Sequence, residues 1–272
     1  KVVKVNYKFF NQSFLGLIGI FILIIISYSS HYFTKHNFFH NSIILLIGII
    51  SFSYFFFKER KKKEILNINF FFLLLFISFI LFKSHDDFSY YHFPYTYYLT
   101  QSKIIFGIGN FDHGFRTPSS LFYLNSLFYL PVIKYYFFHI GAILIMGFTS
   151  YHFLYLIQKG LKNKNYDKFF FLSLLFFMFT LIFFYRIAEH GTDRSAQILI
   201  FLLVIELLII INLNKNIKEN IIKISTILGL VISLKSFYVL YILLTFPVFY
   251  YFLIDKKYNN IFLIFKNYFF YY

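Results

Sequence analysis

Long uncharged hydrophobic runs dominate the chain and limit what it can fold into. The runs long enough, or nearly long enough, to cross a bilayer are Phe9–Ser30, Ser42–Phe57, Ile65–Phe82, Tyr135–Ile157, Phe169–Tyr185 and Ile198–Asn212. A spanning helix needs roughly 20 apolar residues, and shorter runs are tolerated where the bilayer thins. Charged residues make up only 14% of the chain, whereas soluble domains carry roughly a quarter. The sequence therefore predicts an all-α polytopic membrane protein.

A seventh run, Ile221–Ile254, is too long for one span and carries Lys235 in its middle. We interpret it as two spans joined by a tight turn at Lys235, with Ile261–Tyr272 beginning a ninth. This gives about eight to nine transmembrane helices in a single transmembrane domain covering residues 1–272. Because the chain starts at Lys1 and stops inside an aromatic run, we interpret it as a fragment of a longer protein.

Lys and Arg alternate in abundance between successive connections. One set of connections holds 17 of them, and the other holds 8. The positive-inside rule places the richer set, and with it the N-terminus, in the cytoplasm. We therefore expect a multi-pass protein of a bacterial inner membrane with its active face in the periplasm. The net charge of +15 is spread over these short clusters, so it does not indicate a nucleic-acid partner.

The longest connection on the predicted outer face covers residues 83–134. Pro94 can begin a helix, since its missing N–H costs nothing in the first turn. Pro94 to Phe106 mixes apolar and polar residues, as a helix lying in the membrane interface does. Ser119 to Leu130 predicts a second apolar helix in the same loop. We expect an outer-face loop with two interfacial helices.

Two polar clusters lie in this loop. Asp86 and Asp87 directly follow a hydrophobic run, where a carboxylate can act as a general base or bind a divalent cation such as Mg or Mn. Alternatively, the pair only caps the next helix. Arg116, between glycines and a proline, can hold a phosphate with two parallel hydrogen bonds. Alternatively, it is a solvated side chain in a turn.

A third cluster lies between two apolar runs and holds Glu189, His190, Asp193 and Arg194. Surface ion pairing is the simpler explanation, but a passive short loop has little reason to carry such mixed charge. Lys235 is predicted on the same face, where it either binds a ligand or extends its ammonium group to water. Glu206 lies within an apolar run, so it is either buried and paired or a proton site.

The acidic pair, the helices around Arg116 and the later charged loop resemble the GT-C superfamily of polytopic glycosyltransferases. That superfamily includes protein mannosyltransferase and aminoarabinose transferase types of the bacterial envelope. In many members the acid follows the first span, whereas here it follows the third. The resemblance implies transfer of a sugar from a polyprenyl-phosphate donor to a lipid, glycan or protein acceptor outside the cytoplasm.

The resemblance also implies roles for individual residues. Asp86 or Asp87 would be the catalytic base or metal-binding acid. Substrate would be bound by the remaining polar groups, with Arg116, Arg194 and Lys235 on the carrier phosphate, and Glu189, His190 and Asp193 beside them. A transporter is the main alternative, and an envelope polysaccharide polymerase or ligase shares the outer-face chemistry. A purely scaffolding role fits the charged outer loop least.

Overall fold

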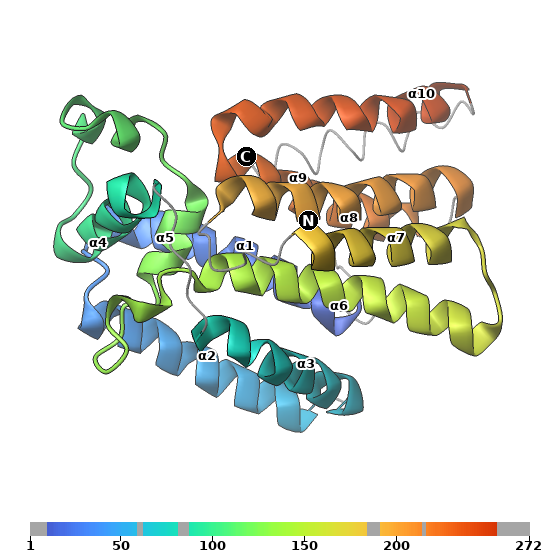
Figure 1. The fold of residues 1–272 in the computed structure, drawn as a ribbon, viewed down its shortest axis with the longest axis horizontal. Helices are drawn as coiled ribbons and strands as arrows, with labels where there is room; N and C mark the ends of the chain where they lie inside the picture. The colour runs from blue at the N-terminus through green and yellow to red at the C-terminus, as the bar shows by residue number, and fades with distance from the viewer. Residues whose placement is uncertain (1–9, 59–61, 81–86, 184–190, 214–215, 255–272) are drawn as a thin grey trace, which may run out of the picture. The chain divides into compact units, whose positions relative to one another are not determined.

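The computed structural model describes residues 10–58, 62–80, 87–183, 191–213 and 216–254, and these residues are all-α (Figure 1). Their α-helices are α1 (Gln12–His31), α2 (Phe38–Lys58), α3 (Lys62–Ile80), α4 (Phe93–Gln101), α5 (Ser120–Ser126), α6 (Ile140–Asn163), α7 (Lys168–Phe183), α8 (Thr192–Leu213), α9 (Ile217–Leu234) and α10 (Phe246–Ile254). The shorter helices are η2 (Phe88–His92), η3 (Ile108–Asn110), η4 (His113–Arg116), η5 (Tyr135–Phe137) and η6 (Ser236–Thr245). The predicted fold class is confirmed.

Five described helical stretches are long and apolar enough to cross a membrane: Gln12–His31, Phe38–Lys58, Tyr135–Asn163, Thr192–Asn212 and Ser236–Ile254. They indicate a multi-pass membrane protein. The larger number of eight to nine spans is not shown. Helix α7 is apolar but shorter, and α9 carries charged residues in its first half. The expected ninth span, from residue 261 to 272, lies outside the described residues.

The long run from 221 to 254 is divided at the predicted place. Helix α9 ends at Leu234, Lys235 adopts an extended backbone, and η6 begins at Ser236. Helices η6 and α10 then return along α9 (Figure 1). A lone Lys in an apolar run therefore did mark a turn, because its ammonium group reaches water most easily at a helix end.

The segment between α3 and α6 contains both predicted helices, and the second of them is buried within unit 2. Helix α4 has Pro94 in its first turn and ends at Gln101, before the expected Phe106. Helix α5 is capped by Ser119, and every one of its residues is buried. Its polar side chains have internal partners: Asn125 Oδ1 accepts the Gly141 N–H at 2.8 Å, and Ser126 Oγ lies 2.7 Å from His36 Nδ1. These bonds satisfy polar side chains of the buried helix.

The chain divides into two compact units. The described residues of unit 1 are 10–21, 148–183, 193–213 and 216–254, and those of unit 2 are 22–58, 62–80, 87–147 and 191–192. Unit 2 has an aromatic core in which Tyr95 and Leu99 of α4 pack against Phe122 and Tyr123 of α5. This core fixes the fold of the loop that follows α3.

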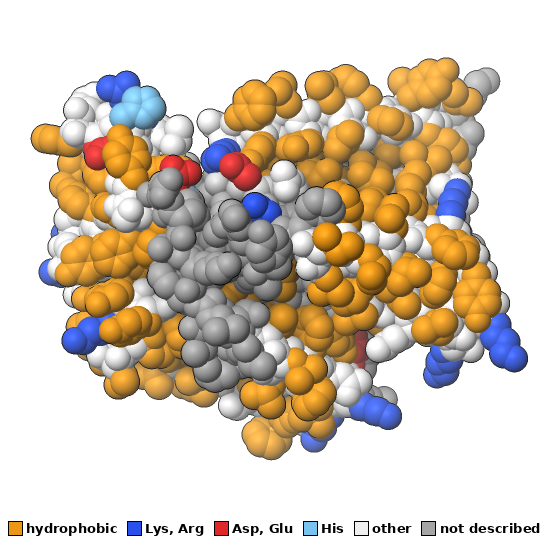
Figure 2. Space-filling view, viewed as in Figure 1, with side chains coloured by type: hydrophobic (Ala, Val, Ile, Leu, Met, Phe, Trp, Pro, Cys, Tyr) orange, Lys and Arg blue, Asp and Glu red, His pale blue; other side chains and the backbone are white. Residues whose placement is uncertain are grey.

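Unit 1 presents broad apolar surfaces to its surroundings. Helix α7 exposes a broad face of large side chains, among them Phe171, Leu175, Met178 and Ile182. Along α10, Phe246, Tyr250, Leu253 and Ile254 are exposed, and hydrophobic side chains predominate along this edge of the space-filling view (Figure 2). Soluble monomers rarely expose apolar patches of this extent, whereas lipid-facing helices do so as a rule.

Candidate functional site

Three polar side chains meet at one end of the unit 1 helices, and we call them the Asp193 cluster (Asp193, Lys235 and Tyr238). Asp193 lies in the first turn of α8, Lys235 joins α9 to η6, and Tyr238 lies in η6. Asp193 Oδ1 accepts a hydrogen bond from Lys235 Nζ at 2.5 Å and another from the Tyr238 hydroxyl. The structure thus joins two segments about 42 residues apart in sequence.

The cluster combines an acid, a cation and a phenol in partly exposed positions. The side chains of Asp193 and Lys235 are 58% and 32% exposed. The positive end of the α8 dipole favours the carboxylate of Asp193 in its first turn. Lys235 and Tyr238 are hydrogen-bond donors, and an anionic oxygen of a ligand could replace Asp193 as their acceptor. The arrangement can therefore bind a phosphate or a sugar hydroxyl at a helix end.

Tyr238 was not predicted. Its only sequence signal is its spacing, because residues three apart stack on one side of a 3₁₀-helix, and Tyr238 is the third residue after Lys235. In a chain with 25 Tyr, that signal does not distinguish one phenol from the others. Of the remaining predicted residues in this region, Arg194 lies in α8, half buried. Glu189 and His190 lie outside the described residues.

Asp87 belongs to unit 2 and is exposed. It occupies the N-cap position of η2, but its side chain makes no capping hydrogen bond. Capping therefore does not account for this carboxylate. Its predicted partner Asp86 lies outside the described residues. Among the described residues, no group of three or more His, Asp or Glu side chains is arranged to hold a metal ion.

Arg116 closes a glycine loop in unit 2. Its Nε donates to the Gly109 carbonyl oxygen at 3.1 Å, and a Cβ on Gly109 would lie 3.1 Å from Arg116 Cγ. The absence of a side chain on Gly109 therefore permits this close approach. The bond uses one of five guanidinium donors, and the side chain is exposed. Among the predicted site residues that the structure describes, Asp193 and Lys235 are the pair in direct contact.

A second polar group lies inside unit 1, and we call it the buried network (Asn11, His152, Glu206 and Lys223). Lys223 Nζ lies 3.1 Å from both carboxylate oxygens of Glu206, and Glu206 is fully buried. Glu206 is therefore buried and paired, which is the first of the two alternatives that the sequence left open. Lys223 is one of the 17 Lys and Arg residues that the charge pattern assigns to the cytoplasmic connections. In the structure it instead lies within α9, beside Glu206 of α8, and a buried carboxylate requires such a partner.

The other two members come from α6 and from the start of α1. His152 Nε2 lies 3.4 Å from Glu206 Oε1, an ion-pair distance. On the opposite side of the ring, His152 Nδ1 lies 3.0 Å from Asn11 Nδ2. Asn11 Oδ1 accepts the backbone N–H of Phe14 at 2.9 Å and caps α1. Four helices of unit 1 are thus connected through polar side chains.

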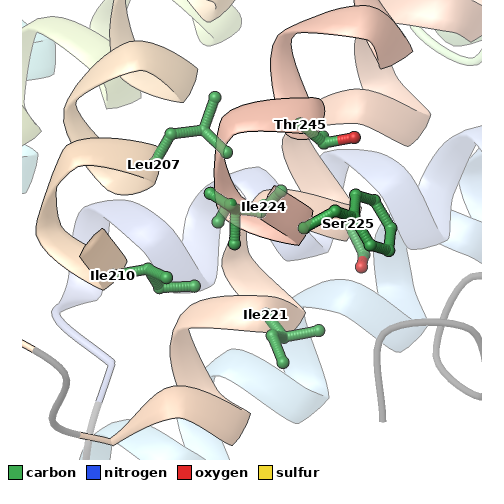
Figure 3. A pocket seen from close by; sticks show the side chains of 8 residues that line it. Leu207, Ile210, Ile221, Ile224, Ser225 and Thr245 are labelled. Carbon is green, nitrogen blue, oxygen red and sulfur yellow. The ribbon is translucent and has the colours of Figure 1, made fainter. Parts of the chain in front are cut away.

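A small pocket lies between α8, α9 and the η6–α10 segment (Figure 3). Its lining is apolar apart from Ser225 and Thr245. The Ser225 hydroxyl is buried without a hydrogen-bond partner. The free volume is about 10 Å³, which is about the space that one water molecule requires. In this arrangement the pocket is too small for an isoprenoid chain.

The helices and their polar groups define a multi-pass α-helical membrane protein with charged groups at its helix ends and inside one helical unit. The chain belongs to the family described as "Domain of unknown function (DUF8201)", whose model matches residues 1–271. No curated protein and no solved structure matches the chain.

Proposed function

We propose that the protein is a membrane glycosyltransferase that moves a sugar from a polyprenyl-phosphate-linked donor to an extracytoplasmic acceptor. The observation that carries the proposal is the Asp193 cluster. It places a cation and a phenol donor at the end of apolar helices, where the phosphate of a lipid carrier would lie. Asp193 holds both donors in position by accepting their hydrogen bonds.

The reaction requires a base for the acceptor and cations for the departing phosphate. The acceptor hydroxyl gives its proton to Asp87 or Asp86, and its oxygen forms a bond to the anomeric carbon. The bond from that carbon to the phosphate oxygen breaks, and the phosphate leaves with the electron pair. Lys235, Arg194 and Arg116 stabilise the added negative charge. The Asp87 carboxylate is exposed, so an acceptor hydroxyl could reach it.

The alternating charge of the connections supports a location in a bacterial inner membrane, with a cytoplasmic N-terminus and a periplasmic reaction. Glu189 and His190 would then lie on the periplasmic side and bind sugar or acceptor hydroxyls. A divalent cation, Mg or Mn, could be held by Asp86 and Asp87, because both ions prefer carboxylate oxygens.

The test uses membranes containing the full chain and a panel of radiolabelled polyprenyl-phosphate sugars. Transfer of label to an acceptor fraction should be abolished by Asp87→Asn and strongly reduced by Lys235→Met. Asp112→Asn and Lys103→Met are the matched controls. Asp112 only caps η4 through a bond to the Gly114 N–H, and Asn caps nearly as well. Label transfer at the wild-type rate by both Asp87→Asn and Asp86→Asn would contradict the proposal.

A transporter is the second candidate, and the buried network favours it. Ionisable residues inside membrane helices often mark ion or substrate pathways. In a transporter, Glu206→Gln should stop substrate flux into proteoliposomes, whereas Asp87→Asn should have little effect. A transferase predicts the reverse order of sensitivity, so the same two variants separate the candidates.

A further inference from the structure

The buried network has features that glycosyl transfer does not use, and these begin with the orientation of the Asn11 side chain. Asn11 Oδ1 accepts hydrogen bonds from the Phe14 N–H at 2.9 Å and from Ser13 Oγ at 3.0 Å. The amide oxygen is therefore fixed at the N-terminus of α1. The Nδ2 group must then point the other way, toward His152 Nδ1 at 3.0 Å.

This orientation assigns the tautomer of His152. An amide NH₂ group is only a donor, so His152 Nδ1 must accept and carries no proton. The ring proton of a neutral His152 is then on Nε2, which faces Glu206 Oε1 at 3.4 Å. A cationic His152 would place a second N–H against the Asn11 NH₂ group, and two donors would oppose each other.

The charge balance of the network agrees with a neutral ring. Glu206 already receives two hydrogen bonds from Lys223, so one negative and one positive charge are paired. The described groups around the His152 ring come from four places. Asn11 and Phe14 lie at the start of α1, Glu206 lies on α8 and is paired with Lys223 of α9, and Tyr155 lies on α6 with His152 itself. Lys223 Nζ lies 5.6 Å from the Phe14 ring centroid, which further stabilises that cation.

We infer that Asn11, His152, Glu206 and Lys223 form a proton-linked site inside unit 1, in which the Asn11 amide keeps His152 neutral with its proton on Nε2. A proton can enter at His152 Nδ1 only if the Asn11 amide turns and presents its oxygen to the new N–H. That turn withdraws the oxygen from the Phe14 N–H, so binding of the proton releases the N-cap of α1. The site thus links proton occupancy to the end of a membrane helix. It does not depend on the glycosyltransferase proposal.

The experiment uses the full chain in lipid nanodiscs with ¹⁵N-labelled histidine. The His152 signals are assigned through their through-space contact with Phe14, whose ring centroid lies 6.1 Å from that of His152. From about pH 8 to about pH 5, where ordinary histidines titrate, wild-type His152 should stay neutral with its proton on Nε2. In Asn11→Asp, the carboxylate still caps α1 but accepts from Nδ1–H, so His152 should be cationic over the same range.

A second measurement tests the link to the helix end. When wild-type His152 is finally charged at lower pH, hydrogen exchange of the Phe14 amide should accelerate at least several-fold relative to the Leu15 amide. The Leu15 N–H is a matched control, because it bonds to the Asn11 backbone oxygen at 3.1 Å rather than to the side chain. The inference is overturned if wild-type His152 titrates like an exposed histidine, if Asn11→Asp leaves it neutral, or if the exchange ratio does not change.

Discussion

Glu206 of α8 and Lys223 of α9 form an ion pair in which both carboxylate oxygens lie 3.1 Å from the ammonium nitrogen, 17 residues apart in sequence. A pair like this adds little net stability over apolar residues of similar size, but loss of one partner leaves an uncompensated buried charge. Its main consequence is that α8 and α9 can pack together in only one register.

Lys223→Met should lower the free energy of unfolding by about 3–5 kcal/mol, because it leaves Glu206 buried without its cation. Combining Lys223→Met with Glu206→Gln should recover most of that loss. Unfolding in detergent micelles, followed by circular dichroism, measures both. Lys218→Met on the same helix is the control and should have little effect. A Lys223→Met loss no larger than that of Lys218→Met would be evidence against the buried pair.

Gly141→Ala should destabilise unit 2. A Cβ at this position would lie 2.7 Å from Asn125 Oδ1 and 2.8 Å from Leu121 Cδ1, so α5 would have to move away from α6. Such overpacking costs about 1–3 kcal/mol. Gly48→Ala in α2 is the matched control, because nothing lies within 4 Å of its added Cβ. It should be neutral or slightly stabilising in a thermal unfolding assay, and equal effects of the two substitutions would refute the contact.

Asp193→Asn should reduce sugar transfer much more than it reduces the free energy of unfolding. The bond between Asp193 and Lys235 is partly exposed, so its loss should change the free energy of unfolding by about 0.2–1 kcal/mol. Sugar transfer should fall much more, because Lys235 and Tyr238 lose the acceptor that orients them. Both quantities are measured on the same membrane preparation. If transfer is unchanged while stability changes slightly, the Asp193 cluster is structural only.

Stability of unit 2 should decrease on acidification because of His36. Burial lowers the pKa of this side chain to about 3, and nearby His31 and His40 act in the same direction. The unfolded chain binds a proton near the ordinary histidine pKa of about 6.5, so stability is lost as pH falls from there toward the folded pKa. The expected slope approaches about 1.4 kcal/mol per pH unit. His36→Asn should reduce this slope, and an unchanged slope would assign it to another group.

The sequence located the helices well because each apolar run has to be covered by lipid or protein along its length. Lys235 marked the α9–η6 turn, and Pro94 marked the start of α4, since both signals are local. The burial of α5 could not be predicted. It depends on His36 and Gly141, which are distant in sequence and become partners only when unit 2 packs.

The candidate site was predictable in part for the same reason. The alternation of charged connections put Asp193 and Lys235 on one face, where the structure joins them. The sequence did not distinguish Tyr238 from the other tyrosines. The pairing of Lys223 with Glu206 depends on the helical register of α8 and α9, and an apolar sequence without other markers does not specify that register.

Helix α2 is fastened at one end. Asn41, near its start, is buried and its side-chain amide donates to the carbonyl oxygens of His36, Ser126 and Tyr129, whereas only 6% of its spanning window is buried. A helix that is held at one end can change its tilt about that end. Its tilt should therefore follow the thickness of the surrounding bilayer, so that thin and thick membranes would hold α2 at different angles about Asn41.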